Sequence, residues 1–391
     1  MRPLCKSGKI NRNGLDTPAM NAVLKTTKYV ILLLLTITSC REKFPVVDDP
    51  TDDPVEIPSD RDSSGCPGIS MDDMPCVEVS DEPLLKVASY NIWSPSGRTG
   101  DKGAKTEELK EILKWENAAV AVAECIKADF PDIIGLNEVS SMSFDIFGLL
   151  PSYEKVIFDK NGTPVTSSSQ TSGLLSLSCC LLYSPDVVEL KESGVFRTAP
   201  KELDGAAVRD HKTGKEVDVC NEQRHCVWAL FTHLESGEDF HVFCLHNDVT
   251  YSYTDAAGQV VKDERSQCAN AETVLAQAGR MVSAGNRSII LGDFNATAGD
   301  ASFELFRSSD RWTDAYEEVS LREGTYITSG RAITTMNAKD NETLSTIRPD
   351  HILSDGFNVV AYGVDRNKYR SSAGDYIFPS DHFLVYSLLD F

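Results

Sequence analysis

The stretch SIILGDFNAT, residues 288–297, runs from large apolar residues directly into a polar pair. Its apolar run, 289–291, is typical of a fully buried strand, and Gly292 then lets the backbone turn. Asp293 and Asn295 follow, so a carboxylate and an amide stand at the end of a buried strand. Taken alone, both are also ordinary turn residues. The other predicted strands therefore decide whether this polar pair belongs to a functional site.

Polar residues of the same kind recur at the ends of other predicted strands. They are Asn91 in KVASYN, Glu138 in DIIGLNE, His246 and Asp248 in FHVFCLHND, Asp350 before HIL, and Asp381 and His382 before FLVYSLL. Each one has an ordinary structural explanation, such as a turn former or a buried histidine with a backbone partner. Together they form one set of acids, amides and imidazoles, which favours a shared catalytic site.

Residues 84–391 alternate short apolar runs with two helical patterns. The helices are predicted at 106–130 and 263–285, where apolar residues recur on one face. Strands are predicted at 84–93, 132–139, 153–158, 178–184, 187–196, 226–234, 240–246, 288–293, 348–354, 357–364 and 382–390. Many strands, two helices and no repeat of fixed period predict a mixed α/β fold. We expect mostly antiparallel pairing in two packed sheets with helices outside them.

The composition is that of a globular protein, with 41% hydrophobic and 25% charged residues among 391. The formal net charge is −21. Nucleic-acid binders gain affinity by neutralising phosphates with clustered Lys and Arg, and basic residues here occur only as scattered pairs. We therefore expect no stable nucleic-acid binding, although an enzyme can touch a polyanion briefly through bound metal ions.

The polar set has the chemistry of metal-assisted hydrolysis. Glu138 and Asp381, with the Asn91 amide, offer hard oxygen ligands of the kind that Mg²⁺ or Mn²⁺ prefers. An Asp–His pair can orient an imidazole and raise its basicity, and a second histidine with an amide can stabilise developing oxyanion charge. This inventory suits hydrolysis of a phosphate ester, with water as the nucleophile and the metal as a Lewis acid.

Six motifs then point to one known group of proteins. They are ASYNIW, DIIGLNEVS, FCLHNDV, IILGDFNAT, IRPDHIL and PSDHFLV. In order and approximate spacing, this set resembles the endonuclease/exonuclease/phosphatase superfamily, which includes deoxyribonucleases and sphingomyelinases, and the resemblance covers 84–391. It implies a four-layer αββα sandwich of two mostly antiparallel sheets flanked by helices. It also implies a site at the rim, where strand ends of both sheets meet.

The resemblance assigns metal binding to one part of the set. Glu138 resembles the principal metal-binding glutamate, Asn91 its companion near the metal, and Asp381 a further metal contact. Asn137 departs from the pattern, because the family usually has glutamine before this glutamate. Leu291 also departs from the signature of inositol phosphatases, which carry an aromatic residue before the glycine, so that subgroup is disfavoured.

The resemblance assigns the chemical steps to the remaining residues. Asp293 resembles the residue that aligns the attacking water or relays a proton, and Asn295 the one that holds the phosphate. His382 resembles the general base or phosphate-facing histidine, with Asp350 as its orienting partner. His246 resembles the second histidine, which stabilises the phosphoryl oxygens or protonates the leaving group.

The first 40 residues predict an export signal. Lys25 and Lys28 precede an apolar run at 29–37, which is shorter than the about 20 residues that a membrane span needs. A complete signal begins at Met20, which is therefore an alternative start. The end of the segment, ITSC, resembles the lipobox of bacterial lipoproteins, in which the cysteine, here Cys40, becomes the lipidated N-terminus.

Residues 41–83 predict a tether rather than a packed element, because they are rich in proline and acidic residues and poor in large apolar ones. The domain at 84–391 would then be held at the bacterial cell envelope, in the periplasm or at the cell surface. The lipid anchor would be its only membrane attachment, and we expect a monomer.

Cysteine pairing stays open at the level of sequence. An exported protein can form disulfides, and Cys66 with Cys76 or Cys220 with Cys226 could each close a short loop. Plain buried thiols are the other interpretation of these cysteines.

The sequence thus predicts a lipid-tethered, metal-dependent phosphoesterase that acts on a phosphodiester rather than a monoester. A sphingomyelinase-like lipid phosphodiesterase is an alternative within the same fold. A non-catalytic envelope binding protein that keeps the fold is an alternative from another class. Substrate choice is expected to lie in polar loops at 94–108, 197–217, 249–264, 329–346 and 366–378.

Overall fold

The structure, a computed structural model, describes residues 83–100, 106–174, 178–320 and 347–391. All of them belong to one compact unit, Ser80–Phe391. The predicted signal peptide with Cys40, the tether with Cys66 and Cys76, and the loop 329–346 lie outside the described residues. Within the described ranges, no helix has the length and apolar character needed to cross a membrane.

The first sheet has six strands in the order β15-β18-β1-β2-β4-β3. Their bounds are β1 Leu84–Asn91, β2 Ile133–Val139, β3 Glu154–Val156, β4 Ser178–Tyr183, β15 Asn358–Asp365 and β18 Leu384–Asp390. The β1–β2 pair is parallel and the other neighbours are antiparallel.

The second sheet also has six strands, in the order β13-β14-β12-β9-β8-β5. Their bounds are β5 Val188–Arg197, β8 His225–His233, β9 Asp239–His246, β12 Arg287–Asp293, β13 Thr313–Asp314 and β14 Asp350–Asp355. Here β9 and β12 form the parallel pair, and the other neighbours are antiparallel. Every strand predicted from the sequence is therefore present, whereas the two-residue β13 was not predicted.

The two parallel pairs explain why polar strand ends meet. Parallel neighbours bring their carboxyl ends to the same edge of a sheet. In the first sheet Asn91 lies opposite Asn137, which directly precedes Glu138 in the chain. In the second sheet Asp293 lies opposite His246. Each sheet therefore delivers two predicted site residues to one edge.

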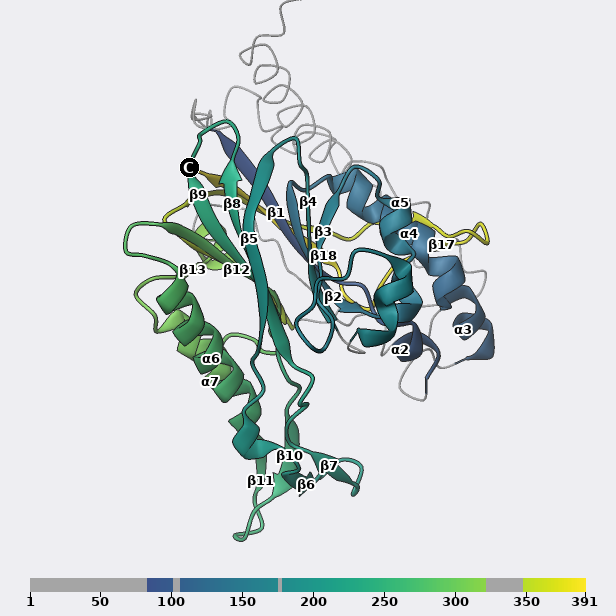
Figure 1. The fold of residues 1–391 in the computed structure, drawn as a ribbon. Coiled ribbons are helices and arrows are strands. Elements are labelled where there is room, and N and C mark those ends of the chain that lie inside the picture. Colours follow the sequence, from purple (N-terminus) through teal and green to yellow (C-terminus); the bar gives the residue numbers. More distant parts are fainter. Residues whose placement is uncertain (1–82, 101–105, 175–177, 321–346) are drawn as a thin grey trace, which may run out of the picture. The chain divides into compact units, whose positions relative to one another are not determined.

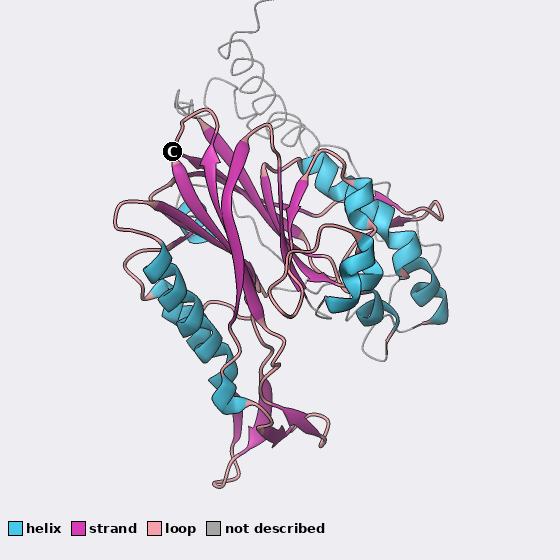
Figure 2. Cartoon of the chain, viewed as in Figure 1, coloured by secondary structure: helices cyan, strands magenta, loops and turns pink. Residues whose placement is uncertain are grey.

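The layers follow from the alternation of side chains along each strand. Ile289 and Leu291 belong to the core between the two sheets, whereas Ile290 packs with Val274 and Ala278 of helix α6 (Arg265–Met281). The run that opens β12 is apolar throughout because both of its faces are buried. Helices cover the outer face of each sheet (Figures 1 and 2). The predicted αββα sandwich is confirmed.

The first predicted helix, 106–130, is two helices in the structure. They are α3 Glu107–Leu113 and α4 Trp115–Asp129, separated at Lys114, whose backbone is extended (φ −57°, ψ 150°). Asn117 Nδ2 donates a hydrogen bond to the Glu111 carbonyl oxygen (2.8 Å), and Arg98 Nη1 to that of Leu113 (3.4 Å). These side chains satisfy carbonyls at the end of α3 that a continuous helix would satisfy internally.

The second predicted helix, 263–285, is shorter in the structure. Helix α6 spans Arg265–Met281, and Val282 is already extended (ψ 108°). Gly285, which marks the predicted end, has φ +87° and lies in the turn beyond the helix. The glycine therefore marks the reversal of the chain rather than the last helical residue.

Several smaller elements were not predicted. They are α2 Pro95–Thr99, α5 Ile146–Leu149, α7 Ala301–Arg307, α8 Ala315–Ser320, the short 3₁₀ turns Ser141–Ser143, Ser168–Gly173 and Lys201–Leu203, and the strands β6 Ala207–Arg209, β7 Glu216–Asp218, β10 Tyr251–Thr254, β11 Val260–Asp263, β16 Tyr369–Arg370 and β17 Tyr376–Ile377. The β6–β7 and β10–β11 hairpins project together beyond one end of the second sheet (Figure 1). Cys220 and Cys226 are free, buried thiols, so they form no loop disulfide with each other.

Candidate active site

Asp293, at the end of β12, is the centre of the site. Its Oδ2 accepts a hydrogen bond from Asn91 Nδ2 at 3.0 Å and lies 3.4 Å from His246 Nε2 and 3.7 Å from His382 Nε2. Its Oδ1 accepts the backbone N–H of Asn295 at 2.8 Å. The side chain is 1% exposed. One buried carboxylate thus contacts residues from both sheets.

Asn91 and Glu138 form the side of the site that comes from the first sheet. Asn91 Nδ2 donates to Glu138 Oε1 (3.2 Å), and Glu138 Oε2 accepts the Ser94 N–H (2.7 Å). Asn91 Oδ1 accepts the Trp93 N–H (3.0 Å). Asn91 and Glu138, two of the three residues predicted to bind metal, are therefore held in contact by the turn that follows β1.

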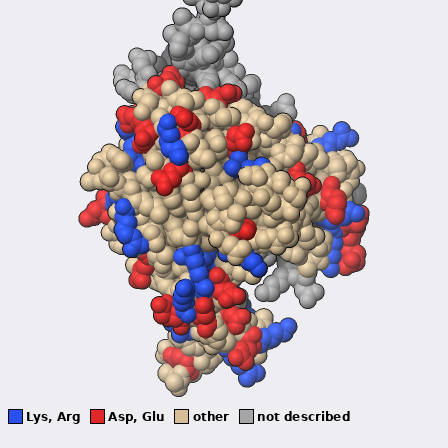
Figure 3. Space-filling model, viewed as in Figure 1, with Lys and Arg blue, Asp and Glu red and all other residues tan. Residues whose placement is uncertain are grey.

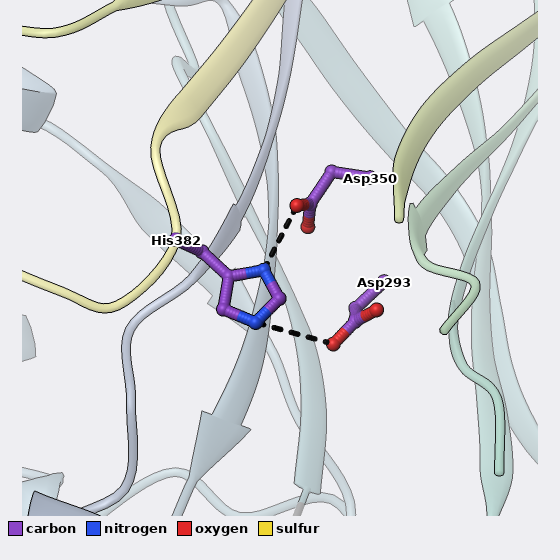
Figure 4. A group of neighbouring side chains, drawn as sticks. All are labelled: Asp293, Asp350 and His382. Atoms are coloured by element: carbon purple, nitrogen blue, oxygen red, sulfur yellow. Dashed lines mark hydrogen bonds and ion pairs between the residues drawn. The ribbon is translucent and has the colours of Figure 1, made fainter. Parts of the chain in front are cut away.

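His382 and Asp350 form a buried ion pair (Figure 4). His382 Nδ1 lies 2.8 Å from Asp350 Oδ2, and the other ring nitrogen faces Asp293. Burial works against a charged imidazole, but the charges of Asp350 and Asp293 outweigh it and raise the pKa of His382 to about 10. The imidazolium therefore persists at neutral pH. Asp350 thus contacts His382, as its predicted orienting role requires.

His246 has the opposite electrostatics. Burial lowers its pKa, and the nearby charge of Arg224 lowers it further, although Asp293 acts in the opposite sense. Its Nδ1 is buried and has no hydrogen-bond partner among the described residues. His246 is therefore a neutral imidazole at neutral pH, in contrast to His382.

Asn295 is fixed by its surroundings at the edge of the site. Its Nδ2 donates to the Asn247 carbonyl oxygen (3.0 Å), and its own carbonyl oxygen accepts Gln267 Nε2 (2.8 Å). Asn295 has φ +48° and Glu138 has φ +65°, a conformation that non-glycine residues rarely adopt. Such strain persists only where the surrounding structure enforces it, and it concentrates at functional sites.

Asp381 lies beside the site, and its charge contributes to the raised pKa of His382. Its Oδ1 is 3.4 Å from Ser380 Oγ, which also donates to the Asn91 carbonyl oxygen at 2.6 Å. The buried Arg98 donates to the backbone oxygens of Ile92 (2.6 Å) and Pro379 (2.7 Å). Arg98 and Ser380 thereby join the end of β1 to the segment that carries Asp381 and His382.

The donor chemistry fits a divalent metal ion in two places. Asp293, Asp350 and His382 are the one group among the described residues whose His, Cys, Asp or Glu donor atoms lie within 4.8 Å of one another. A histidine binds metal only when it is deprotonated, however, and the pKa of His382 is raised. The second place, formed by the carboxylate of Glu138 and the amide of Asn91, is therefore favoured as the metal site.

Glu138 has the electrostatics of a metal-binding carboxylate. Burial raises its pKa, but the Ser94 N–H, the Asn91 amide and the positive charge of His382 together lower it below the ordinary value. A buried carboxylate that stays ionised is stabilised by a cation, and oxygen donors are those that Mg²⁺ and Mn²⁺ prefer.

Two supporting residues, Asn137 and Gln267, were missed by the sequence reasoning. Asn137 Nδ2 donates to the Leu245 carbonyl oxygen, and its Oδ1 accepts the Asp293 N–H, both at 2.9 Å. It therefore joins the first sheet to both strands of the parallel pair in the second. Gln267 is a buried polar residue on the apolar face of α6, and that mismatch was a signal that could have identified it.

Comparisons with known proteins agree with this geometry. The sequence profile of the Endonuclease/Exonuclease/phosphatase family matches residues 88–382. No curated protein gives a significant match to the chain.

Three solved structures illustrate the likeness of fold. An endonuclease/exonuclease/phosphatase family protein from Bacteroides thetaiotaomicron is 22% identical, with a TM-score of 0.56 over 79% of this chain and 98% of that chain. A mannosyl-6-phosphatase from the same organism is 21% identical, with a TM-score of 0.56 over 78% of this chain and 100% of that chain. The catalytic domain of human Nocturnin is 19% identical, with a TM-score of 0.50 over 79% and 94%.

At identities this low, the comparisons demonstrate a shared fold. They do not demonstrate a shared substrate. The profile, in contrast, spans the motifs from the end of β1 to His382, which include every residue predicted for the site. The chain therefore belongs to the endonuclease/exonuclease/phosphatase family, whose members are hydrolases that act on phosphoric ester bonds.

Proposed function

We propose that the chain hydrolyses a phosphodiester by attack of water, with Mg²⁺ or Mn²⁺ as its cofactor. The observation that carries the proposal is the convergence on Asp293 Oδ2 of Asn91 Nδ2 (3.0 Å), His246 Nε2 (3.4 Å) and His382 Nε2 (3.7 Å). These are residues of three different strand ends. A complete set in mutual contact argues against a binding protein that merely keeps the fold.

Asp293 is the residue best placed to align the attacking water and to accept its proton. Its carboxylate faces both histidines, and the side chain is 1% exposed. A carboxylate at this position can act as a general base through direct contact with the water. Asn295, anchored beside it, is proposed to bind the phosphate.

The two histidines take different roles because their charges differ. His382, held as an imidazolium by Asp350, is suited to binding the phosphoryl oxygens as negative charge develops. His246 is neutral and its Nε2 lies 3.4 Å from Asp293 Oδ2, so it can take up the proton that Asp293 accepts from water and pass it to the leaving oxygen. This assignment makes His382 the phosphate-facing histidine rather than the base.

Glu138 and Asn91 would hold the metal ion, with Asp381 as a further contact. When bound, the ion supplies Lewis-acid stabilisation of charge on the phosphoryl oxygens. The Ser94 N–H keeps Glu138 oriented toward the site, and Asn91 connects that carboxylate to Asp293.

A substrate screen tests the proposal. The purified protein is assayed on bis(p-nitrophenyl) phosphate, p-nitrophenyl phosphate, sphingomyelin and DNA, with Mg²⁺, with Mn²⁺ and with EDTA. We expect the simple diester to be hydrolysed with either metal, and EDTA to abolish the activity. Hydrolysis of the monoester alone would overturn the diester assignment, and a preference for sphingomyelin would favour the lipid phosphodiesterase.

We also propose that Cys40 anchors the protein to the bacterial cell envelope. The support is the lipobox-like sequence ITSC after a short apolar run. Cells that express the protein would incorporate labelled palmitate into it, and Cys40→Ala would release it into the soluble fraction. Membrane association that survives this substitution without any labelling would contradict the anchor.

A further inference from the structure

A cavity opens beside the active site. It has a volume of about 880 Å³ and lies between the β6–β7 hairpin, the loop 219–224 and the segment 248–251. The two hairpins that surround it are joined where the His211 N–H donates to the Ser252 carbonyl oxygen at 2.6 Å. We call this cavity the hairpin pocket; its hairpins are the elements that project in Figure 1.

The hairpin pocket shares a wall with the catalytic site. Asp248 lines the pocket and follows His246 by two residues. Gln267 Nε2 donates to the carbonyl oxygens of both Asp248 (2.6 Å) and Asn295 (2.8 Å). A group bound in the pocket would therefore lie next to a phosphate held by Asn295 and His246.

Arg224 marks the inner end of the pocket. It lines the cavity and is 5% exposed, and its Nε donates to Asp248 Oδ1 at 3.0 Å. Its Nη1 is buried and has no hydrogen-bond partner among the described residues. A buried guanidinium with unused donors is costly, so an acceptor supplied by a ligand would satisfy it. The inner end of the pocket thus suits a phosphate oxygen.

The outer wall of the pocket is rich in hydrogen-bond acceptors. Glu216, Asp218 and Glu222 line it, and their carboxylates make no hydrogen bond or ion pair with another described residue. Glu216 and Asp218 are two apart on β7, so they face the same side of the hairpin. Ionised carboxylates only accept hydrogen bonds, so this wall requires a ligand that donates several.

The remaining lining excludes several kinds of ligand. Among the described residues that line the pocket, Tyr251 is the single aromatic and Arg224 the single cation. A strand of nucleic acid needs stacking platforms along a basic groove, and an acyl chain needs an apolar wall. Hydroxyl groups, in contrast, are strong donors to carboxylates.

We propose that the hairpin pocket binds the sugar of a phosphodiester in which one of the two esterified alcohols is a sugar or glycan, and that this diester is cleaved at the catalytic site. Sugar hydroxyls would donate to Glu216, Asp218 and Glu222, and the phosphate would lie between Arg224 and the catalytic residues. This inference rests on the proposed phosphoesterase activity, and it names the class of alcohol that the phosphate esterifies.

Binding and turnover together test the inference. The probes are glucose 6-phosphate, ethyl phosphate, which has no hydroxyl group, and glucosamine 6-phosphate, which adds an ammonium group. Equilibrium binding is measured by calorimetry on the full-length Asp293→Asn protein. Turnover of bis(p-nitrophenyl) phosphate is measured on the wild type with Mg²⁺. Loss of even one charge-assisted hydrogen bond corresponds to about tenfold in Kd.

The pocket variant is Glu216→Gln/Asp218→Asn, and Glu235→Gln is its matched control. Both change exposed carboxylates to amides, and Glu235 lies in the β8–β9 turn, at the opposite end of β9 from His246. We expect glucose 6-phosphate to bind about tenfold more tightly than ethyl phosphate. The pocket variant should lose that preference, and the control should keep it.

The outcomes separate the inference from the proposed function. If bis(p-nitrophenyl) phosphate is hydrolysed but glucose 6-phosphate and ethyl phosphate bind equally, the pocket inference fails and the phosphoesterase stands. If the preference for glucose 6-phosphate depends on Glu216 and Asp218 but no ester is hydrolysed, the pocket stands and the proposed function fails. Binding of glucosamine 6-phosphate alone would show a site for amines and would overturn the sugar assignment.

Discussion

His246 and His382 both face Asp293 Oδ2, yet their pKa values move in opposite directions. The difference lies in their neighbours: Asp350 adds a negative charge beside His382, whereas the positive charge of Arg224 acts on His246. Sequence motifs could identify both histidines, because His246 ends an apolar strand and His382 precedes one. They could not assign a protonation state, because that depends on charges far away in the sequence.

The Asp350–His382 pair makes a prediction about pH. His382 has a pKa of about 10 in the fold, above its ordinary 6.5. The pair therefore contributes stability that is complete below pH 6.5 and is lost as the pH rises toward 10. We expect Asp350→Asn to flatten this part of the stability profile in urea unfolding.

The alkaline limb of kcat/KM in the Asp350→Asn variant should also move to lower pH, with kcat reduced about 100-fold or more.

Asp310→Asn is the matched control for this prediction, because Asp310 is exposed and remote from the site residues in the sequence. It should leave both pH profiles as they are in the wild type. If Asp350→Asn leaves the alkaline limb in place, then Asp350 does not hold the proton on His382.

At the scale of elements, strand β12 is placed by a glycine that no other residue can replace. Gly292 has φ +143°, and a Cβ built there would lie 1.9 Å from the Leu245 carbonyl oxygen of β9. We expect Gly292→Ala to cost about 3 kcal/mol or more in the free energy of unfolding, since strain and a backbone clash act together. Urea denaturation measures the loss.

Gly148→Ala is the control for the Gly292 substitution. Gly148 lies in α5, and a Cβ there meets nothing within 4 Å. Alanine should be neutral at this position or stabilise the protein by less than about 1 kcal/mol. Equal losses for the two variants would show that the close approach of β12 to β9 is not required.

Asn137 connects the sheets at the level of the site. Asn137→Ala would leave the Asp293 N–H and the Leu245 carbonyl oxygen without their partner, inside the core. We expect a loss of about 1–3 kcal/mol in stability. Because Asp293 would shift, kcat should fall about tenfold to 100-fold with KM nearly constant.

Ser89→Ala is the matched control for Asn137→Ala. Ser89 is also a buried polar residue of the first sheet, but its Oγ has no hydrogen-bond partner in the described part of the chain. Its removal should change neither stability nor kcat appreciably. A kcat that is unaffected in Asn137→Ala would restrict this residue to a purely structural role.

Elements were predictable from the sequence to the extent that local pattern defines them. The strands of both sheets follow from apolar runs that end in polar residues, as β12 does. The break at Lys114 was not predictable, because it depends on contacts made by Asn117 and by Arg98. The hairpins β6–β7 and β10–β11 lack a buried face, so their short strands carry no clear periodicity.

At the scale of the whole molecule, charge restricts the partners. The chain carries −21 overall, and on the face drawn in Figure 3 acidic side chains lie among the basic ones rather than apart from them. We expect no stable complex with a 30-base-pair DNA duplex in gel-shift assays at physiological salt, up to about 10⁻⁵ M protein, because clustered cations are lacking. A retarded band at a lower protein concentration would contradict this expectation. It would show that the protein has a basic surface despite its negative net charge.

The architecture, and the residues that the structure brings together around Asp293, could thus be predicted from strand ends and motif order. The hairpin pocket could not, because Arg224, Asp248 and Glu216 are brought together only by the fold. The identity of the metal ligands is a proposal that rests on Glu138 and Asn91 being in contact.

Hydrolysis of bis(p-nitrophenyl) phosphate by wild-type protein and Asp293→Asn, each titrated with Mg²⁺ after EDTA treatment, tests the central claim most directly. We expect no activity without metal, recovery with Mg²⁺ in the wild type, and a loss of about 1000-fold or more in kcat for Asp293→Asn. Circular dichroism would verify that the variant is folded. Metal-independent hydrolysis, or hydrolysis by Asp293→Asn at the wild-type rate, would contradict metal-assisted hydrolysis centred on Asp293.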